Sequence, residues 1–300
     1  SYLGIDQEHQ MTFFVSFGGP GGSAVRSSFT PIFYDEFFPR EEAPPTPPED
    51  FSERAGKYAG DYGFWRGNFS TIEKAMGVAA SVKVAPTEDN TLMVGLFGKA
   101  KQYVEVEDNL FREQHPGISM VPGLSPRLLA FQENDKGQIT GFVMDGLPFM
   151  SLRKLAFYET PSFNFTLLGF AMLVFLWVLL RRFFQREAIK ALPDADRSAV
   201  RAAVYASAGN WLALGVGAIV FSAVQEQIYS EIPLLFKLWL VLPVIATLIG
   251  LFLLFKTIGV WKQGLLSGMW ARVRYTIVAL CALYMCWFYY FWNILGWQYK

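Results

Sequence analysis

The chain has 300 residues, enough for about two domains, and 52% of them are hydrophobic and 17% aromatic, both high values for a soluble protein. The formal net charge of zero conceals a division, because residues 1–161 carry 14 basic and 21 acidic side chains, whereas residues 162–300 carry 12 basic and 5 acidic ones. These figures exclude a wholly soluble globule, and they exclude a basic nucleic-acid binder because the positive charge lies between apolar segments.

Residues 1–39 predict a β-hairpin followed by a helix. Ser1–Ile5 and Met11–Phe17 are apolar segments separated by a polar turn, a pattern typical of paired strands. The cluster Gly18-Gly19-Pro20-Gly21-Gly22 follows; it lacks the Lys-Ser/Thr of a P-loop and the spacing of a dinucleotide-binding loop, so we interpret it as a strand-to-helix turn. Apolar residues then recur at helical spacing: Val25, Phe29, Ile32, Phe33 and Phe37.

Two strands and one helix cannot bury a core alone. We therefore interpret residues 1–39 as the closing edge of a larger α/β domain. Without a partner, the segment is expected to be poorly ordered or to expose apolar surface at Phe13, Phe14, Val15, Phe29 and Phe33.

Residues 40–50 form a Pro-rich acidic linker, and residues 51–157 predict an antiparallel β-rich module. The predicted strands are Lys57–Phe64, Ala79–Ala85, Thr91–Leu96, Gln102–Val106, Arg127–Phe131, Gln138–Met144 and Phe149–Ala156. A short helix is expected at Ser70–Met76, with Ser70 as its N-cap and Glu73 in the capping-box position. About seven short strands predict a small barrel or sandwich, which either holds an apolar ligand or is filled by its own side chains.

Residues 162–300 contain four apolar segments long enough to cross a bilayer. They are Ser162–Leu180, Ala202–Val224, Pro233–Phe255 and Val273–Trp297. The loops after the first and third segments are rich in Lys and Arg, whereas Gln225–Ile232 has no basic residue. The positive-inside rule then predicts a four-helix anchor in the cytoplasmic (inner) membrane, with residues 1–161 and the C-terminus on the extracytoplasmic side.

Single residues in the spans favour an anchoring role. The aromatic residues of the last span are expected to form an interfacial belt and to pack on neighbouring helices. Gly209, Gly215 and Gly217 are expected to allow close helix contact, and Lys237 is near enough to the outer boundary to reach the interface. The only cysteines, Cys281 and Cys286, lie in an apolar run, so we expect no disulfide framework, no zinc site and no cofactor.

Several segments resemble a known family. Met11–Phe17, the glycine cluster, the helix and Phe37-Phe-Pro39 resemble the end of the catalytic domain of serine hydrolases related to class C β-lactamases and penicillin-binding proteins. Tyr58-Ala-Gly-Asp-Tyr62, Thr71-Ile-Glu-Lys74 and Leu147-Pro-Phe-Met150 resemble the β-rich module that follows it in membrane-bound members, and Trp292-Asn-Ile-Leu-Gly296 is similar to the way such chains end.

The resemblance implies catalytic elements that these segments do not contain. The family uses Ser and Lys in S-x-x-K, a Tyr-x-Asn element and a Lys- or His-initiated strand motif, all of which precede the segment that residues 1–39 match. We therefore expect no catalytic residue in this chain, and an N-terminal catalytic domain upstream of Ser1.

Three short segments match catalytic motifs of the family by chance. Ser151-Leu-Arg-Lys154 fits S-x-x-K, Ser162-Phe-Asn164 fits S-x-N, and His115-Pro-Gly117 fits H-x-G, but their order is wrong. Ser151 and Lys154 also fall on a predicted strand, where residues three apart point to opposite faces. Lys154 is close to the first span and is expected to meet lipid headgroups.

The favoured hypothesis is therefore the accessory and membrane-anchor region of a serine hydrolase that acts on amide or ester substrates, such as peptidoglycan-type peptides or β-lactams, outside the cytoplasmic membrane of a bacterium. The alternative is a non-catalytic multi-pass membrane protein with an extracytoplasmic β domain that binds a ligand or partner. A transporter would show paired charges near the midplane or broken helices, which the sequence does not indicate.

Overall fold

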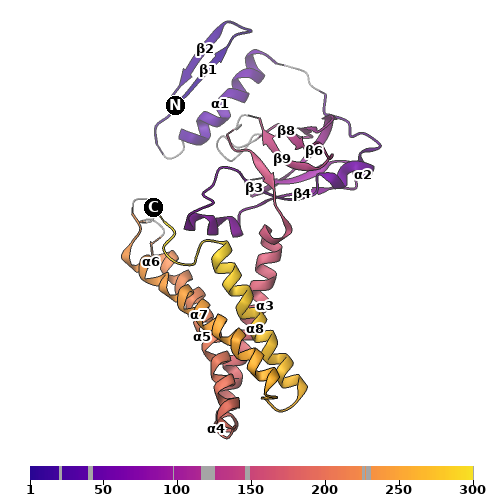
Figure 1. Cartoon of the computed structure of the whole chain (residues 1–300). Helices are drawn as coiled ribbons and strands as arrows, with labels where there is room; N and C mark the ends of the chain where they lie inside the picture. The colour runs from indigo at the N-terminus through magenta and orange to yellow at the C-terminus, as the bar shows by residue number, and fades with distance from the viewer. Residues whose placement is uncertain are drawn as a thin grey trace. The chain divides into compact units, whose positions relative to one another are not determined.

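A computed structural model describes residues 1–19, 22–39, 43–96, 98–115, 126–145, 149–224, 227 and 231–299. The chain divides into two compact units: Ser1–Arg66 with Ala80–Ala156, and Gly67–Ala79 with Phe157–Lys300. Strands belong to the first unit and the long helices to the second (Figure 1). The multi-domain architecture of a β-barrel and an α-helical membrane bundle agrees with the fold class expected from the sequence.

The N-terminal segment is a hairpin and a helix, as its pattern predicts. Strands β1 (Tyr2–Asp6) and β2 (Met11–Val15) pair antiparallel, and α1 spans Gly22–Phe37 (Figure 1). The backbone N–H of Gly22 donates to the carbonyl of Gly19 at 3.1 Å, which makes the described part of the glycine cluster a strand-to-helix turn. Pro20 and Gly21 lie outside the described residues.

Eight antiparallel strands close into a barrel, which decides between the barrel and the sandwich. Their order around the barrel is β10-β3-β4-β5-β6-β7-β8-β9, so each strand pairs with its neighbours in sequence and β10 closes the circle against β3. The strands are β3 Gly60–Phe64, β4 Val82–Pro86, β5 Leu92–Leu96, β6 Lys99–Glu107, β7 Leu110–Glu113, β8 Leu128–Glu133, β9 Ile139–Met144 and β10 Leu152–Lys154.

Apolar side chains fill the interior of the barrel. Alternate residues of each strand point inward, as in β5, where Leu92, Val94 and Leu96 are buried and their neighbours are not. Aromatic rings occupy one end: Phe131 lies with its ring centre 5.0 Å from those of Tyr58 and Phe142. The short helix α2 (Phe51–Arg54) adds Phe51, which is fully buried beside Tyr58. Of the two alternatives left open by the sequence, the structure shows the filled barrel.

Two local predictions in the β-rich region were wrong. Strand β7 was missed because Leu110–Glu113 is only four residues long and carries two charges, too short for alternation to stand out. The predicted capping box at Ser70 is also absent: the segment is a 3-10 helix, η2 (Ile72–Val78), which begins after Thr71 and has no side-chain cap hydrogen bond.

Among the described residues, four helices are long and apolar enough to cross a membrane, which confirms the predicted multi-pass organisation. The spans are α3 Pro161–Phe184, α5 Asp194–Val224, α6 and α7 together over Leu234–Lys262, and α8 Met269–Phe291. Within the third span, α6 (Leu234–Trp239) and α7 (Val241–Lys262) meet at Leu240, and the short α4 (Arg186–Lys190) follows α3. Residues 292–297 were expected to continue the last span, but α8 ends at Phe291 and these residues are not helical.

Small residues bring the helices close together, although not at every predicted glycine. A Cβ added at Gly217 would lie 2.7 Å from the Trp239 ring, whose Nε1–H donates to the carbonyl of Ala213 at 2.7 Å. A Cβ at Gly209 would lie 3.6 Å from the Cα of Ala246. Gly215 was predicted wrongly, since a Cβ there would meet no atom within 4 Å; it faces open space beside the bundle.

The connection between β3 and β4 is part of the helical unit. Residues 67–79 include η2, and the backbone N–H of Ile72 donates to the carbonyl of Gln298 at 2.7 Å. The side-chain amide of Asn293 donates to the carbonyls of Phe69 and Thr71, both at 3.0 Å. The sequence pattern placed these residues within the β-rich module, because nothing in their own sequence indicates the distant partners.

Candidate functional site

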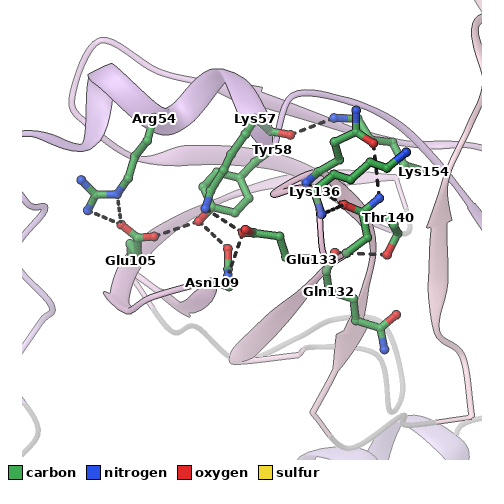
Figure 2. Close-up of polar contacts among 12 residues, drawn as sticks. Arg54, Lys57, Tyr58, Glu105, Asn109, Gln132, Glu133, Lys136, Thr140 and Lys154 are labelled. Atoms are coloured by element: carbon green, nitrogen blue, oxygen red, sulfur yellow. Dashed lines mark hydrogen bonds and ion pairs between the residues drawn. The ribbon is translucent and has the colours of Figure 1, made fainter.

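The S-x-x-K match does not form a nucleophile–base pair. Lys154, in β10, directs its ammonium to the carbonyl of Lys57, to which it donates at 2.8 Å, and it lies 5.9 Å from the Tyr62 ring centre (Figure 2). Burial lowers the pKa of Lys154, a property that some catalytic lysines share. Ser151 precedes β10, and its carbonyl accepts from the backbone N–H of Trp65 at 2.9 Å. Lys154 therefore connects β10 to the segment that precedes β3, instead of reaching toward headgroups as expected.

The S-x-N match has a structural role at the start of α3. Asn164 is fully buried and donates to the carbonyls of Tyr158 (2.9 Å) and Thr160 (3.0 Å). Its side-chain oxygen accepts from the Trp292 indole at 3.0 Å, and its backbone carbonyl accepts from the Tyr284 hydroxyl at 2.9 Å. In the third match, His115 is exposed at the end of β7, and Pro116 and Gly117 lie outside the described residues.

A cluster of charged and polar side chains lies at the end of the barrel that α2 covers (Figure 2). Arg54 donates from Nε to Glu105 Oε2 at 3.0 Å and from a terminal nitrogen to Asp50 at 2.7 Å. The Glu105 side chain is only 3% exposed, so a charge-assisted bond from Arg54 compensates for much of its lost hydration. This ion pair joins α2 to β6.

Tyr58 extends the cluster from Glu105 to a second ion pair. Its hydroxyl lies 3.0 Å from Glu105 Oε1 and 2.8 Å from Asn109 Oδ1, so its one proton is shared between two acceptors. The Asn109 amide donates to Glu133 at 3.2 Å, and Lys57 donates to the same carboxylate at 3.0 Å (Figure 2). These two bonds lower the pKa of Glu133.

The interactions of this cluster indicate a structural role. Arg54 pairs with Glu105 and Asp50, and Lys57 pairs with Glu133, so the three carboxylates of the network are all paired. Burial and the Glu105 carboxylate raise the pKa of Tyr58, which keeps the phenol protonated and makes it a donor and not a nucleophile or base. Across the described residues, no group of three or more His, Cys, Asp or Glu side chains is arranged to hold a metal ion.

Sequence reasoning missed this cluster because its members are far apart in the chain. Arg54 and Glu105 are separated by about 50 residues, and no local spacing connects them. The one available signal was Glu105 itself, an acidic residue between two valines of a predicted strand.

A second carboxylate cluster joins the hairpin to α1. Asp6 accepts hydrogen bonds from the backbone N–H of His9 (2.9 Å) and from the Tyr34 hydroxyl (2.8 Å), and the His9 ring lies 2.9 Å from the same carboxylate. The His9 ring also packs on Phe38, with centres 4.1 Å apart. No spacing in the sequence connects His9 with Tyr34 and Phe38, because the hairpin turn and the helix meet only in the folded segment.

This cluster predicts an acid-sensitive hairpin. The three hydrogen bonds lower the pKa of Asp6 from 3.8 to about 2. The stabilisation is therefore fully present above pH 3.8 and is lost as the pH falls toward 2, because the unfolded segment takes up the proton first. Hydrogen exchange of the β1 and β2 amides, corrected for intrinsic rates, should accelerate over this interval in the parent and in Asp35→Asn. In Asp6→Asn the step should disappear; an unchanged step would contradict this assignment.

Comparison with known proteins identifies no relative. No protein-family model matches the chain, and searches of curated proteins and of solved structures find no match.

Proposed function

We propose that this chain is the accessory and membrane-anchor region of a serine hydrolase related to class C β-lactamases and penicillin-binding proteins. The hydrolase would act on amide or ester substrates outside the cytoplasmic membrane. Its nucleophile and oxyanion donors would come from a catalytic domain that packs on the β1–β2 hairpin.

The uncovered face of the hairpin carries this proposal. Register places Leu3 opposite Phe14 and Gly4 opposite Phe13, so the two pairs lie on opposite faces. Phe13 packs on α1, with its ring centre 5.7 Å from that of Phe29. On the other face, Leu3, Ile5 and Phe14 are 59%, 67% and 66% exposed. A two-stranded sheet with one such face and open edges is suited to covering by further strands and a second layer.

The exposure of the apolar side chains in residues 1–39 differs in part from the expectation. Phe13, Val15, Phe29 and Phe33 are partly buried, because the helix and one hairpin face cover each other. Phe14 is exposed as expected. A late strand followed by a helix on one sheet face is the arrangement that the family resemblance implies for the end of the catalytic domain.

The helical unit supports an anchoring role. In the described parts of its spans, the buried polar side chains other than tyrosine and cysteine are the uncharged Asn164, Ser207 and Asn210, whereas transporters use charged groups near the midplane. The basic loops after α3 and after α7 lie at the same end, since Leu266 donates its N–H to Asp196 at 2.8 Å. This shared end agrees with the proposed orientation, in which both loops are cytoplasmic and residues 1–161 and the C-terminus are outside.

The alternative remains a non-catalytic membrane protein whose β domain binds a ligand or partner. Because apolar side chains fill the barrel interior, a ligand would have to use the outer surface of the barrel. No described contact favours such a site.

The proposal is tested first by acylation. A fluorophosphonate or a penicillin-type probe should not label this 300-residue chain, because Lys154 is held by the carbonyl of Lys57. The longer protein should be labelled at a serine of an S-x-x-K sequence encoded upstream of Ser1, together with a Tyr-x-Asn element. Labelling of Ser151, or an initiator Met and signal sequence directly before Ser1, would contradict the proposal.

A second experiment tests the hairpin surface in the longer protein. Phe14→Asp should reduce the yield of acylatable enzyme, because a charge would be buried at the proposed contact. Gln7→Asp, in the exposed hairpin turn, is the matched control and should leave the yield unchanged. Equal yields from both variants would show that no domain packs on this face.

A further inference from the structure

The short α4 lies at one end of the helical unit (Figure 1). A basic cavity lies beside it, with Ile189 of α4 in its lining. Its volume is about 320 Å³, and it is lined by residues from the end of α3, the start of α5 and the start of α8. Three arginines line it, Arg181 and Arg182 from α3 and Arg274 from α8, and none of the described residues that line it is acidic. A cavity with this charge attracts an anion.

Two of the arginines converge on one tryptophan. The guanidinium carbons of Arg181 and Arg274 lie 5.6 and 5.9 Å from the ring centre of Trp177. Arg181 donates to the neutral side chain of Gln185 at 2.9 Å. Within the described residues, no carboxylate forms an ion pair with Arg181, Arg182 or Arg274, although Arg197 pairs with Asp194 nearby. Like charges gathered from two helices are stabilised when an anion lies between them.

A buried hydroxyl in the cavity also has no partner. Tyr275 is 5% exposed and lines the cavity, and its hydroxyl makes no hydrogen bond to any described residue. Leaving such a group unsatisfied is unfavourable, and buried hydroxyls of this kind normally find an acceptor. An anion held by the arginines would supply that acceptor.

The start of α8 adds to the positive potential. Its N-cap, Gly268, provides no side-chain hydrogen bond, and its first turn contains no acidic residue. Ser267 and Ala271, on either side of this helix start, line the cavity. The dipole of α8 therefore favours an anion there.

An apolar groove continues from the cavity along the helices. It is lined by Phe170, Leu173 and Val174 of α3 and Ile277 of α8, and it shares Trp177 and Arg274 with the cavity. The groove lies within membrane-spanning helices, where lipid chains are the surrounding solvent. A ligand that fits both sites has an anionic head and hydrocarbon chains.

We propose that this cavity binds the phosphate of an anionic glycerophospholipid. Arg181 and Arg274 would donate to the phosphate oxygens, Tyr275 would donate its hydroxyl, and an acyl chain would lie in the groove between α3 and α8. This inference does not depend on the proposed function, since it requires only the helical unit.

Binding is measured on the full chain purified in a neutral detergent. Native mass spectrometry should show dioleoyl phosphatidylglycerol bound at least about tenfold more tightly than dioleoyl phosphatidylcholine. Tyr275→Phe, which removes one unpartnered hydroxyl, should weaken phosphatidylglycerol binding several-fold while leaving the thermal stability in phosphatidylcholine unchanged. The double variant Arg181→Gln/Arg274→Gln should lose about tenfold or more of the phosphatidylglycerol affinity.

The matched control is Arg186→Gln/Lys262→Gln, which removes two exposed charges near the same end that do not line the cavity. This control should retain the affinity of the parent. If both double variants lose affinity equally, binding depends on general charge and the proposal is wrong. If inorganic phosphate stabilises the parent as strongly as the lipid does, the site takes a soluble anion and the lipid assignment is wrong.

Discussion

Replacing Asn164 with leucine is expected to destabilise the helical unit by about 3 kcal/mol. The substitution removes the acceptor of the Trp292 indole, which is 4% exposed, and the donor to the carbonyls of Tyr158 and Thr160. The Trp292 indole would then lose its buried acceptor and the carbonyl of Tyr158 its donor, whereas the Thr160 carbonyl would keep the backbone N–H of residue 164. A leucine side chain makes no hydrogen bond that could replace those lost. The free energy of unfolding, measured by SDS titration in mixed micelles with far-UV circular dichroism, checks this value.

The control is Ser162→Leu, two residues earlier on the same helix, where the side chain is exposed. It should change stability by less than about 0.5 kcal/mol. A double-mutant cycle with Trp292→Phe should show coupling, because Trp292→Phe removes the donor that Asn164→Leu leaves unpaired. Additive effects, or an Asn164→Leu variant as stable as the parent, would show that the network contributes little.

Phe131→Ala is expected to destabilise the barrel by about 4 kcal/mol. Phe131 is 6% exposed, and its ring lies among those of Tyr58, Tyr62, Phe111 and Phe142, at centre separations between 5.0 and 6.0 Å. Its removal leaves a cavity. The neighbouring rings cannot move inward to fill it, because the eight strands that hold them form a closed barrel. The opening free energy of barrel amides, obtained by hydrogen exchange on the full chain, measures the effect.

Phe149→Ala provides the comparison, since this ring is 57% exposed and its loss should cost less than about 1 kcal/mol. The new cavity in Phe131→Ala should also bind benzene, as dry engineered cavities do, whereas the filled parent barrel should not. Binding of benzene by the parent would mean that the interior is less completely packed than the structure shows.

The barrel shows which features of the fold could be predicted from local sequence patterns. Seven of the eight strands could be located from alternating residues and turn signals, because the two-residue period is a local property. Whether they closed into a barrel depended on β10 pairing with β3, a contact between the two ends of the module. The network of Arg54, Tyr58 and Glu105 also joins residues about 50 positions apart, so no spacing in the sequence could reveal it.

The chance motif matches show that a sequence pattern can also suggest a site that the fold does not form. Ser151 and Lys154 matched a catalytic pattern in sequence, but β10 directs Lys154 to a backbone carbonyl. Asn164 matched the S-x-N pattern, and in the folded bundle it is a buried group that accepts a hydrogen bond from Trp292. A short motif specifies residue types, whereas catalysis requires their side chains to meet in one place.

The amino-acid sequence by itself determined the four spans, the basic loops between them and the β-rich character of residues 51–157, because segment hydrophobicity and alternation act over one turn or a few residues. Tertiary structure alone decided that the barrel is filled, that residues 67–79 pack with the helices, and that Arg181 and Arg274 meet on Trp177. The physical reason is that these features come from contacts between residues distant in the chain. Their energies depend on how whole elements pack and not on any one segment's composition.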